Sequence, residues 1–205
     1  VIGKMLTALT LICNPARPLL TNELASRLMG ALDLEGRGAA SRRVLNEGVA
    51  DDFLLDVSDP GKLQKEARDF LAGSPIDVVV QPADGRRKRL LVADMDSTII
   101  GQECIDELAD HAGKRAEISA ITERAMRGEL DFEAALLERV AMLKGLPESV
   151  LAATYESRIT LNPGARTLVA TMKKLGAATA LVSGGFDFFT GRVGAAAGFD
   201  THQAN

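Results

Sequence analysis

The chain is poor in the residues that build disulfide-held or zinc-held scaffolds. Its 205 residues include only two cysteines and two histidines. Cys13 and Cys104 are too few for a disulfide framework or a zinc site, so we expect both to be reduced in a cytoplasmic protein. His111 and His202 lack the spacing of metal ligands, and we expect both at the surface.

An excess of positive charge and a long apolar run are also absent. The formal net charge of −4 argues against a nucleic-acid partner, because such a partner calls for a basic face. The one local exception, the basic run at residues 86–89, is interpreted as a solvated linker. The apolar run Met5–Cys13 is too short to span a bilayer and precedes no signal cleavage site, so it predicts a strand and no membrane partner.

Residues 1–85 predict a separate small domain. Apolar stretches at residues 6–14, 41–46, 52–57 and 76–80 are typical of strands. Leucines at a four-residue spacing after Pro18 predict one helix, and Asp59-Pro60 predicts the start of a second. The resulting order, βαββαβ, is that of a ferredoxin-like α+β unit with two helices on one face of an antiparallel sheet.

The most informative segment lies in residues 86–205, where the apolar stretch 90–93 runs into Asp94-Met95-Asp96. The stretch predicts a buried strand of a parallel sheet, and ligands bind beyond the carboxyl ends of such strands. Side chains two positions apart in an extended chain point the same way. Asp94 and Asp96 are therefore expected to face one site.

Two neighbouring carboxylates repel each other unless a cation lies between them, and Mg²⁺ prefers such hard oxygen ligands. This predicts phosphoryl transfer with Asp94 as nucleophile, Asp96 as general acid and then base, and both as ligands of Mg²⁺. Asp-x-Asp also occurs in solvated loops, helix caps and calcium loops. An EF-hand is excluded, because no Asp-rich loop of that pattern follows.

Residues 102–158 have a helical pattern and interrupt the sheet before its next predicted strand, Ala178–Val182. An apolar stripe there carries one cation, Arg139. The guanidinium is expected either to meet a negative partner or to reach water while its stem packs on the stripe, and helix geometry leaves these alternatives even. The stripe consists of Phe132, Ala135, Leu136, Val140 and Leu143.

After the second predicted strand comes Ser183-Gly184-Gly185, followed by a helix that begins near Phe186. A hydroxyl and free backbone N–H groups at a helix start suit an anion. The glycines alone are also explained by a tight turn.

Together these segments resemble the phosphoserine phosphatases of the haloacid-dehalogenase-like superfamily. The first signature is matched by residues 94–98, the second by residues 182–187, and the cap by residues 103–109, 126–132 and 138–140. The resemblance implies an α/β, doubly wound, Rossmann-like core with an inserted helical cap, preceded by a domain similar to the amino-acid-binding ACT modules. These phosphatases also have a Lys that contacts the phosphate and a Gly-Asp-Gly-x-x-Asp segment, and neither is found after Ser183. We therefore expect a truncated fragment that need not be active by itself.

The resemblance also assigns roles to single residues. Ser183 and Gly184 would hold the transferring phosphoryl group. Glu103 would receive the substrate ammonium and Arg139 its carboxylate, since a guanidinium matches a carboxylate as a planar fork. Met126 and Phe132 would line the closed pocket.

The implied activity is hydrolysis of O-phospho-L-serine through a phosphoaspartyl intermediate, the last step of serine biosynthesis. Two alternatives stay open: a related phosphatase for another small phosphate ester, and a non-catalytic serine sensor. For the N-terminal domain, binding of L-serine and a structural or dimerising role in a homodimer are equally compatible with the sequence.

Overall fold

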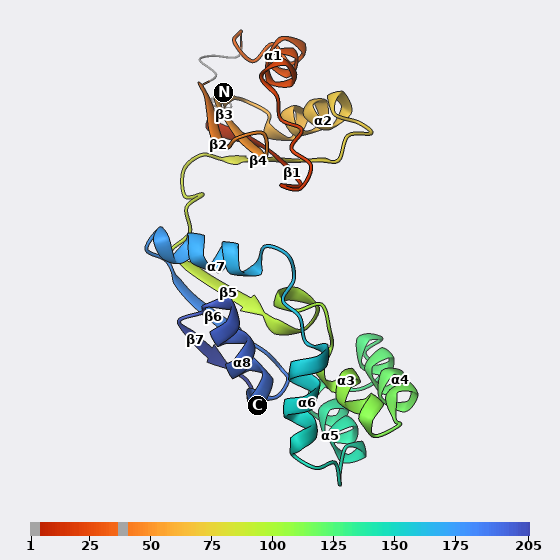
Figure 1. Ribbon diagram of the computed structural model, residues 1–205. Helices are drawn as coiled ribbons and strands as arrows, with labels where there is room; N and C mark the ends of the chain where they lie inside the picture. The colour runs from red at the N-terminus through yellow and green to blue at the C-terminus, as the bar shows by residue number, and fades with distance from the viewer. Residues whose placement is uncertain (1–4, 37–40) are drawn as a thin grey trace. The chain divides into compact units, whose positions relative to one another are not determined.

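The computed structural model describes residues 5–36 and 41–205, apart from the side chain of Met126. The chain forms two compact units, Val1–Arg87 and Lys88–Asn205 (Figure 1). Neither unit has, among its described residues, a helix long and apolar enough to cross a membrane. Both cysteines are buried and unbonded, and both histidines are exposed as predicted.

The first unit has the predicted element order, with both helices on one face of a four-stranded antiparallel sheet (Figure 1). The strand order is β2-β3-β1-β4, so the first and third strands are central. The elements are β1 (Met5–Cys13), α1 (Asn22–Ala31), β2 (Ser41–Asn46), β3 (Ala50–Val57), α2 (Pro60–Phe70) and β4 (Ile76–Pro82).

The core of this unit lies between the sheet and its helices. Leu9 on β1 and Phe53 on β3 alternate with residues of the opposite face and are fully buried against Leu28 and Leu63 of the helices. The second helix begins as predicted, because the Asp59 carboxylate accepts the Lys62 backbone N–H at 2.9 Å.

One prediction is wrong for a residue that contacts the opposite face of this sheet. Arg86 is not a solvated linker residue: its Nη2 lies 2.6 Å from Oδ2 of Asp52 on β3. The other carboxylate oxygen of Asp52 accepts the Thr10 hydroxyl, also at 2.6 Å. The Asp52 side chain is only 5% exposed, and a buried carboxylate requires a partner. Arg86 supplies that partner from a position 34 residues later.

The second unit is built on a three-stranded parallel sheet of order β5-β6-β7. Five helices, α3 to α7, lie between the first two strands in sequence, and the first four of them, α3 to α6, lie in the segment predicted as a cap (Figure 1). The elements are β5 (Leu90–Asp94), the turn η1 (Met95–Ile99), α3 (Cys104–His111), α4 (Arg115–Met126), α5 (Phe132–Met142), α6 (Ser149–Arg158), α7 (Ala165–Lys174), β6 (Ala178–Val182), α8 (Asp187–Ala197) and β7 (Thr201–Gln203).

The core of this unit fixes the end of β5. Met95, directly after the strand, is fully buried in one cluster with Leu181 of β6. Phe189 and Val193, four residues apart on α8, belong to the same cluster. The residues on either side of Met95 are therefore carried at a rigid edge of the sheet.

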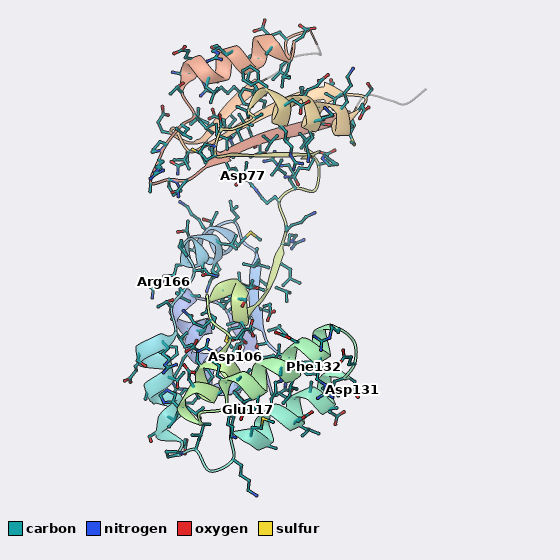
Figure 2. All side chains as sticks on the ribbon, turned by 90° about the vertical axis from the view of Figure 1, so that its right-hand side faces the viewer. Asp77, Asp106, Glu117, Asp131, Phe132 and Arg166 are labelled. Carbon is teal, nitrogen blue, oxygen red and sulfur yellow. The ribbon has the colours of Figure 1, made fainter. Side chains whose placement is uncertain are left out.

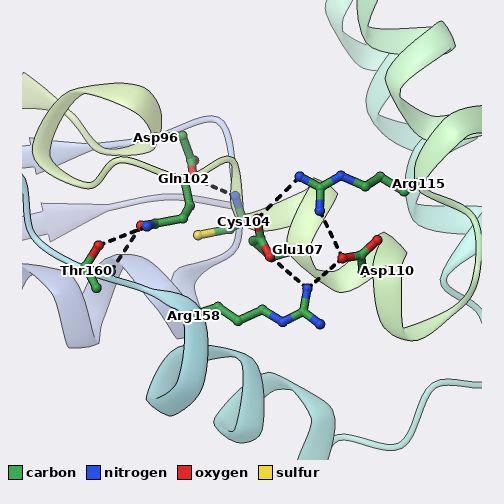
Figure 3. A network of polar contacts seen from close by, with 8 residues as sticks. All are labelled: Asp96, Gln102, Cys104, Glu107, Asp110, Arg115, Arg158 and Thr160. Atoms are coloured by element: carbon green, nitrogen blue, oxygen red, sulfur yellow. Dashed lines mark hydrogen bonds and ion pairs between the residues drawn. The ribbon is translucent and has the colours of Figure 1, made fainter.

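Two connections join this sheet to the cap, and hydrogen bonds tie them together. Gln102 on the outgoing segment and Thr160 on the returning one exchange two bonds, of 2.9 and 3.0 Å (Figure 3). Asn162 donates its side-chain N–H to the carbonyls of Thr98 and Ile100. The cap is thus attached through a defined double connection.

Candidate active site

Asp94 and Asp96 line one cavity of about 180 Å³. Asp94 ends β5, and its Oδ1 accepts the backbone N–H of Met95 at 2.7 Å. Asp96 is extended, with φ −67° and ψ 139°, and Ser97 follows in the left-handed region with φ 50°. The chain therefore turns directly after the second carboxylate, and both acids stay at the cavity.

Asp96 connects the cap to the sheet. Its Oδ1 accepts the backbone N–H of Cys104, the first residue of α3, at 2.9 Å (Figure 3). Its Oδ2 accepts the Ser183 hydroxyl at 3.3 Å. Both oxygens are thus oriented by groups from distant parts of the sequence.

The Ser183-Gly184-Gly185 loop forms the opposite wall of the cavity. The Ser183 hydroxyl is largely buried and accepts the Gly185 N–H at 2.9 Å. A Cβ at Gly185 would lie 3.3 Å from Oδ2 of Asp96, and a Cβ at Gly184 would lie 2.7 Å from the Phe132 ring. A methyl group at Gly184 would therefore have to displace the Phe132 ring, whereas one at Gly185 would require a slight shift of its neighbours Ser183 and Asp96.

The cap supplies the remaining wall. Phe132, at the start of α5, is 60% exposed, but its ring lies over the Gly184 backbone. Figure 2 shows it at the end of its helix beside Asp131, which caps that helix by accepting the Ala134 N–H at 2.8 Å. Phe132 is therefore placed to cover the glycine loop.

Arg139, in the last turn of α5, lines the same cavity. Its Nε donates to the Ala135 carbonyl at 3.1 Å and its Nη1 to the Thr122 hydroxyl at 3.3 Å. No carboxylate of the described residues lies within ion-pair distance of it. Since a guanidinium has five N–H donors, the side chain retains the capacity to bind an anion in the cavity.

Glu103 faces the cavity from the start of α3 and accepts the Ser97 hydroxyl at 2.6 Å. Burial raises the pKa of its carboxyl above the usual range, with the bond from Ser97 opposing this and the carboxylates of Asp96 and Asp106 adding to it. Burial also raises the pKa of Asp106, which Arg115 and Arg139 counteract. The cap therefore offers a negative group and a positive group to one ligand.

Of the predicted site residues, all but one are brought to this cavity. The exception is Met126, whose side chain lies outside the described part of the structure. Sequence reasoning missed several further lining residues, since no local pattern marks an apolar side chain that faces a ligand. These are Cys104, Ile105, Leu136 and Phe186, whereas Gly185, which also lines the cavity, belongs to the loop that was predicted to suit an anion.

The carboxylates of Asp94 and Asp96 are suitable ligands for Mg²⁺, because this ion prefers hard oxygen ligands. Within residues 5–36 and 41–205, no group of three His, Cys, Asp or Glu side chains is arranged to hold a metal. If both were ligands, Asp94 and Asp96 would provide two of the six ligands that octahedral Mg²⁺ takes, about as many carboxylates as Mg²⁺ usually receives beside water and phosphate oxygens.

The sequence is similar to known phosphatases. The phosphoserine phosphatase of Archaeoglobus fulgidus is 47% identical over 158 residues, which cover 75% of this chain and 46% of that protein. The chain spans about half the length of the curated relatives it matches.

The structure is also similar to solved structures of such enzymes. A HAD family hydrolase from Salmonella enterica serovar Typhi superimposes with a TM-score of 0.77 at 30% identity, over 98% of this chain and 67% of that one. A substrate-bound phosphoserine phosphatase gives 0.54 at 38% identity, over 58% of this chain and 56% of that one. The family model for haloacid dehalogenase-like hydrolases matches residues 91–205, and the chain belongs to that family.

Proposed function

We propose that the complete protein hydrolyses O-phospho-L-serine to L-serine and phosphate. The observation that carries the proposal is one cavity with two parts: paired aspartates facing a serine-glycine loop, and a glutamate and an arginine from the cap. The first part suits a phosphoryl group, and the second suits the ammonium and carboxylate of an amino acid. The similarity to phosphoserine phosphatases supports the same substrate.

In the proposed reaction, an Asp94 oxygen attacks phosphorus and forms a phosphoaspartyl intermediate. The bond from phosphorus to the serine oxygen breaks, and protonated Asp96 gives its proton to that oxygen. Asp96 then takes a proton from water as the water oxygen attacks phosphorus. Phosphate leaves and Asp94 is regenerated. The bond from the Cys104 backbone N–H to Oδ1 would keep the Asp96 carboxyl in one orientation through both steps.

The Ser183 hydroxyl and the backbone at Gly184 would bind the transferring phosphoryl oxygens. Mg²⁺, held in part by Asp94 and Asp96, would neutralise phosphoryl charge when bound. Glu103 would bind the ammonium of the substrate and Arg139 its carboxylate. Met126 and Phe132 would close the pocket over it and exclude water.

For the rest of the molecule we propose an ACT-like domain at residues 1–85 and a HAD phosphatase domain at residues 86–205, with its cap at about 102–158. The βαββαβ order and the strand order of the first unit support this division. L-Serine bound to the first domain would give feedback on the last step of serine biosynthesis in the cytoplasm. Alternatively, the first domain would serve to form a homodimer.

The test is Asp94→Asn in the complete protein, compared with the unchanged protein. Asparagine keeps the size of the side chain but is a poor nucleophile, so phosphate release should fall by at least about a thousandfold. A radiolabelled, hydroxylamine-sensitive phosphoenzyme should form only in the unchanged protein. Retained turnover in the variant would reject Asp94 as the nucleophile, and equal rates with sugar phosphates would reject phosphoserine as the preferred substrate.

A further inference from the structure

Ser97 has an unusual backbone for its residue type. Among the described non-glycine residues, only Ser97 and Asp33 have positive φ. The left-handed region is disfavoured for a residue with a Cβ, and glycine would adopt it without that penalty. Turn geometry alone would therefore favour glycine at position 97, which indicates that the serine side chain has a use.

The Ser97 hydroxyl has a specific partner. It donates to Oε1 of Glu103 at 2.6 Å, a short bond to a carboxylate. The Ser97 backbone N–H donates to the Gln102 carbonyl at 3.1 Å, which closes the turn between the two residues. Ser97 is thus held at the start of α3, where its hydroxyl meets the Glu103 side chain.

Glu103 needs such a partner to face the cavity. It occupies the N-cap position of α3, but its side chain makes no capping bond to the helix. Nearby Asp94, Asp96 and Asp106 all repel its negative charge. Without the bond from Ser97, the flexible glutamate side chain would be free to turn toward water and away from these carboxylates.

We propose that Ser97 is a positioning residue that holds the Glu103 carboxylate in the orientation that binds the substrate ammonium. The inference rests on the proposed function, since it assumes an ammonium in the cavity. Ser97 would then set the preference for phosphate esters that carry an amine, without touching the reacting phosphoryl group. The left-handed backbone at Ser97 is the structural consequence of placing the hydroxyl there.

The decisive variant is Ser97→Gly in the complete protein, because glycine removes the hydroxyl and also suits the backbone. The measured quantity is the ratio of kcat/KM for O-phospho-L-serine to kcat/KM for the amine-free ester 3-phosphooxypropanoate. We expect this ratio to fall about tenfold, mainly through a higher KM for phosphoserine, as for loss of a bond to a charged group. The melting temperature should stay the same or rise, since the strain is relieved.

Two further variants complete the experiment. Ser97→Thr retains a hydroxyl and should recover most of the ratio, with a lower melting temperature because a β-branched residue is poor in the left-handed region. Ser157→Ala removes a hydroxyl that bonds only to the Ala153 carbonyl on the exposed side of α6, and should leave the ratio unchanged.

The outcomes separate the two proposals. If the unchanged protein prefers phosphoserine and Ser97→Gly keeps that preference, the role of Ser97 is rejected and the proposed function stands. If the unchanged protein turns over both esters equally, the proposed substrate is rejected, and this inference with it.

Discussion

At the scale of single residues, the clearest constraint is the contact between Gly184 and Phe132. A methyl group added at Gly184 would lie 2.7 Å from the Phe132 ring, so the ring would have to move. We expect Gly184→Ala to lower kcat/KM of the complete protein about tenfold, because small displacements at a closed site are costly. Steady-state phosphate release measures this effect.

A double-mutant cycle identifies the cause. In a Phe132→Ala background the obstacle is gone, so Gly184→Ala should have little further effect. Gly30→Ala is a control, because nothing lies within 4 Å of its added methyl group and it is in a helix. Equal and additive losses in both backgrounds would show that Phe132 is not the group displaced.

The pair formed by Asp52 and Arg86 makes a second residue-scale prediction. Arg86→Met leaves the Asp52 carboxylate, 5% exposed, with the Thr10 hydroxyl as its one remaining partner among the described residues. We expect the first unit to lose about 2–3 kcal/mol of stability, somewhat less than for a fully buried pair because Arg86 is 24% exposed. Urea denaturation followed by circular dichroism measures it.

Lys65→Met is the matched control for Arg86→Met. It removes a pair with Asp69 of similar length, 2.6 Å, but both side chains are largely exposed. Its effect should stay within about 0.5 kcal/mol. Similar losses in the two variants would mean that burial of Asp52 adds nothing to the strength of its pair.

At the scale of elements, Arg158 ties α6 to α3. It donates to Glu107 at 2.9 Å and to Asp110 at 2.7 Å, and Arg115 of α4 meets the same two carboxylates (Figure 3). The bond from Arg158 is the largest cause that holds the pKa of Asp110 below its usual range. A lowered pKa stabilises the fold above the ordinary aspartate pKa, and this stabilisation is lost as pH falls through the lowered value.

The expected result is a melting temperature of the second unit that declines as the pH is lowered below the ordinary aspartate pKa. Arg158→Met should make this decline shallower, because Asp110 then loses its main partner. Differential scanning calorimetry across that range provides the measurement, with Arg192→Met as control, since its side chain donates to a carbonyl and not to a carboxylate. An unchanged pH slope in Arg158→Met would contradict the assigned cause.

Elements that depend on local pattern were predicted well from the sequence. The apolar stretch before Asp94 forms a strand, and the carboxylates follow it at the sheet edge as expected. The prediction that this strand is buried was wrong, since Leu90 is 58% and Val92 57% exposed. Contacts between distant segments outside the motifs of the resemblance were not predicted, because periodicity contains no information about partners. The pairing of Arg86 with Asp52 is one such contact. The bond of Ser97 to Glu103, six positions away, was missed for a different reason, because it needs a left-handed turn that serine rarely adopts.

At the scale of the whole molecule, the two units have separate cores. Among the described residues, Leu63 belongs to the buried core cluster of the first unit and Leu181 to that of the second. A domain with its own core can unfold by itself. The composition and motifs predicted a division near residue 85 but not how independent the two units are, since independence depends on contacts across the boundary.

Calorimetry of matched core variants tests this independence. Leu63 and Leu181 are both fully buried, so each replacement by alanine should cost about 2–5 kcal/mol in its own unit. We expect two unfolding transitions. Leu63→Ala should lower the midpoint temperature of only one of them, and Leu181→Ala that of only the other. A single transition that both variants lower equally would show that the units unfold together, and that destabilising the first unit also unfolds the site in the second.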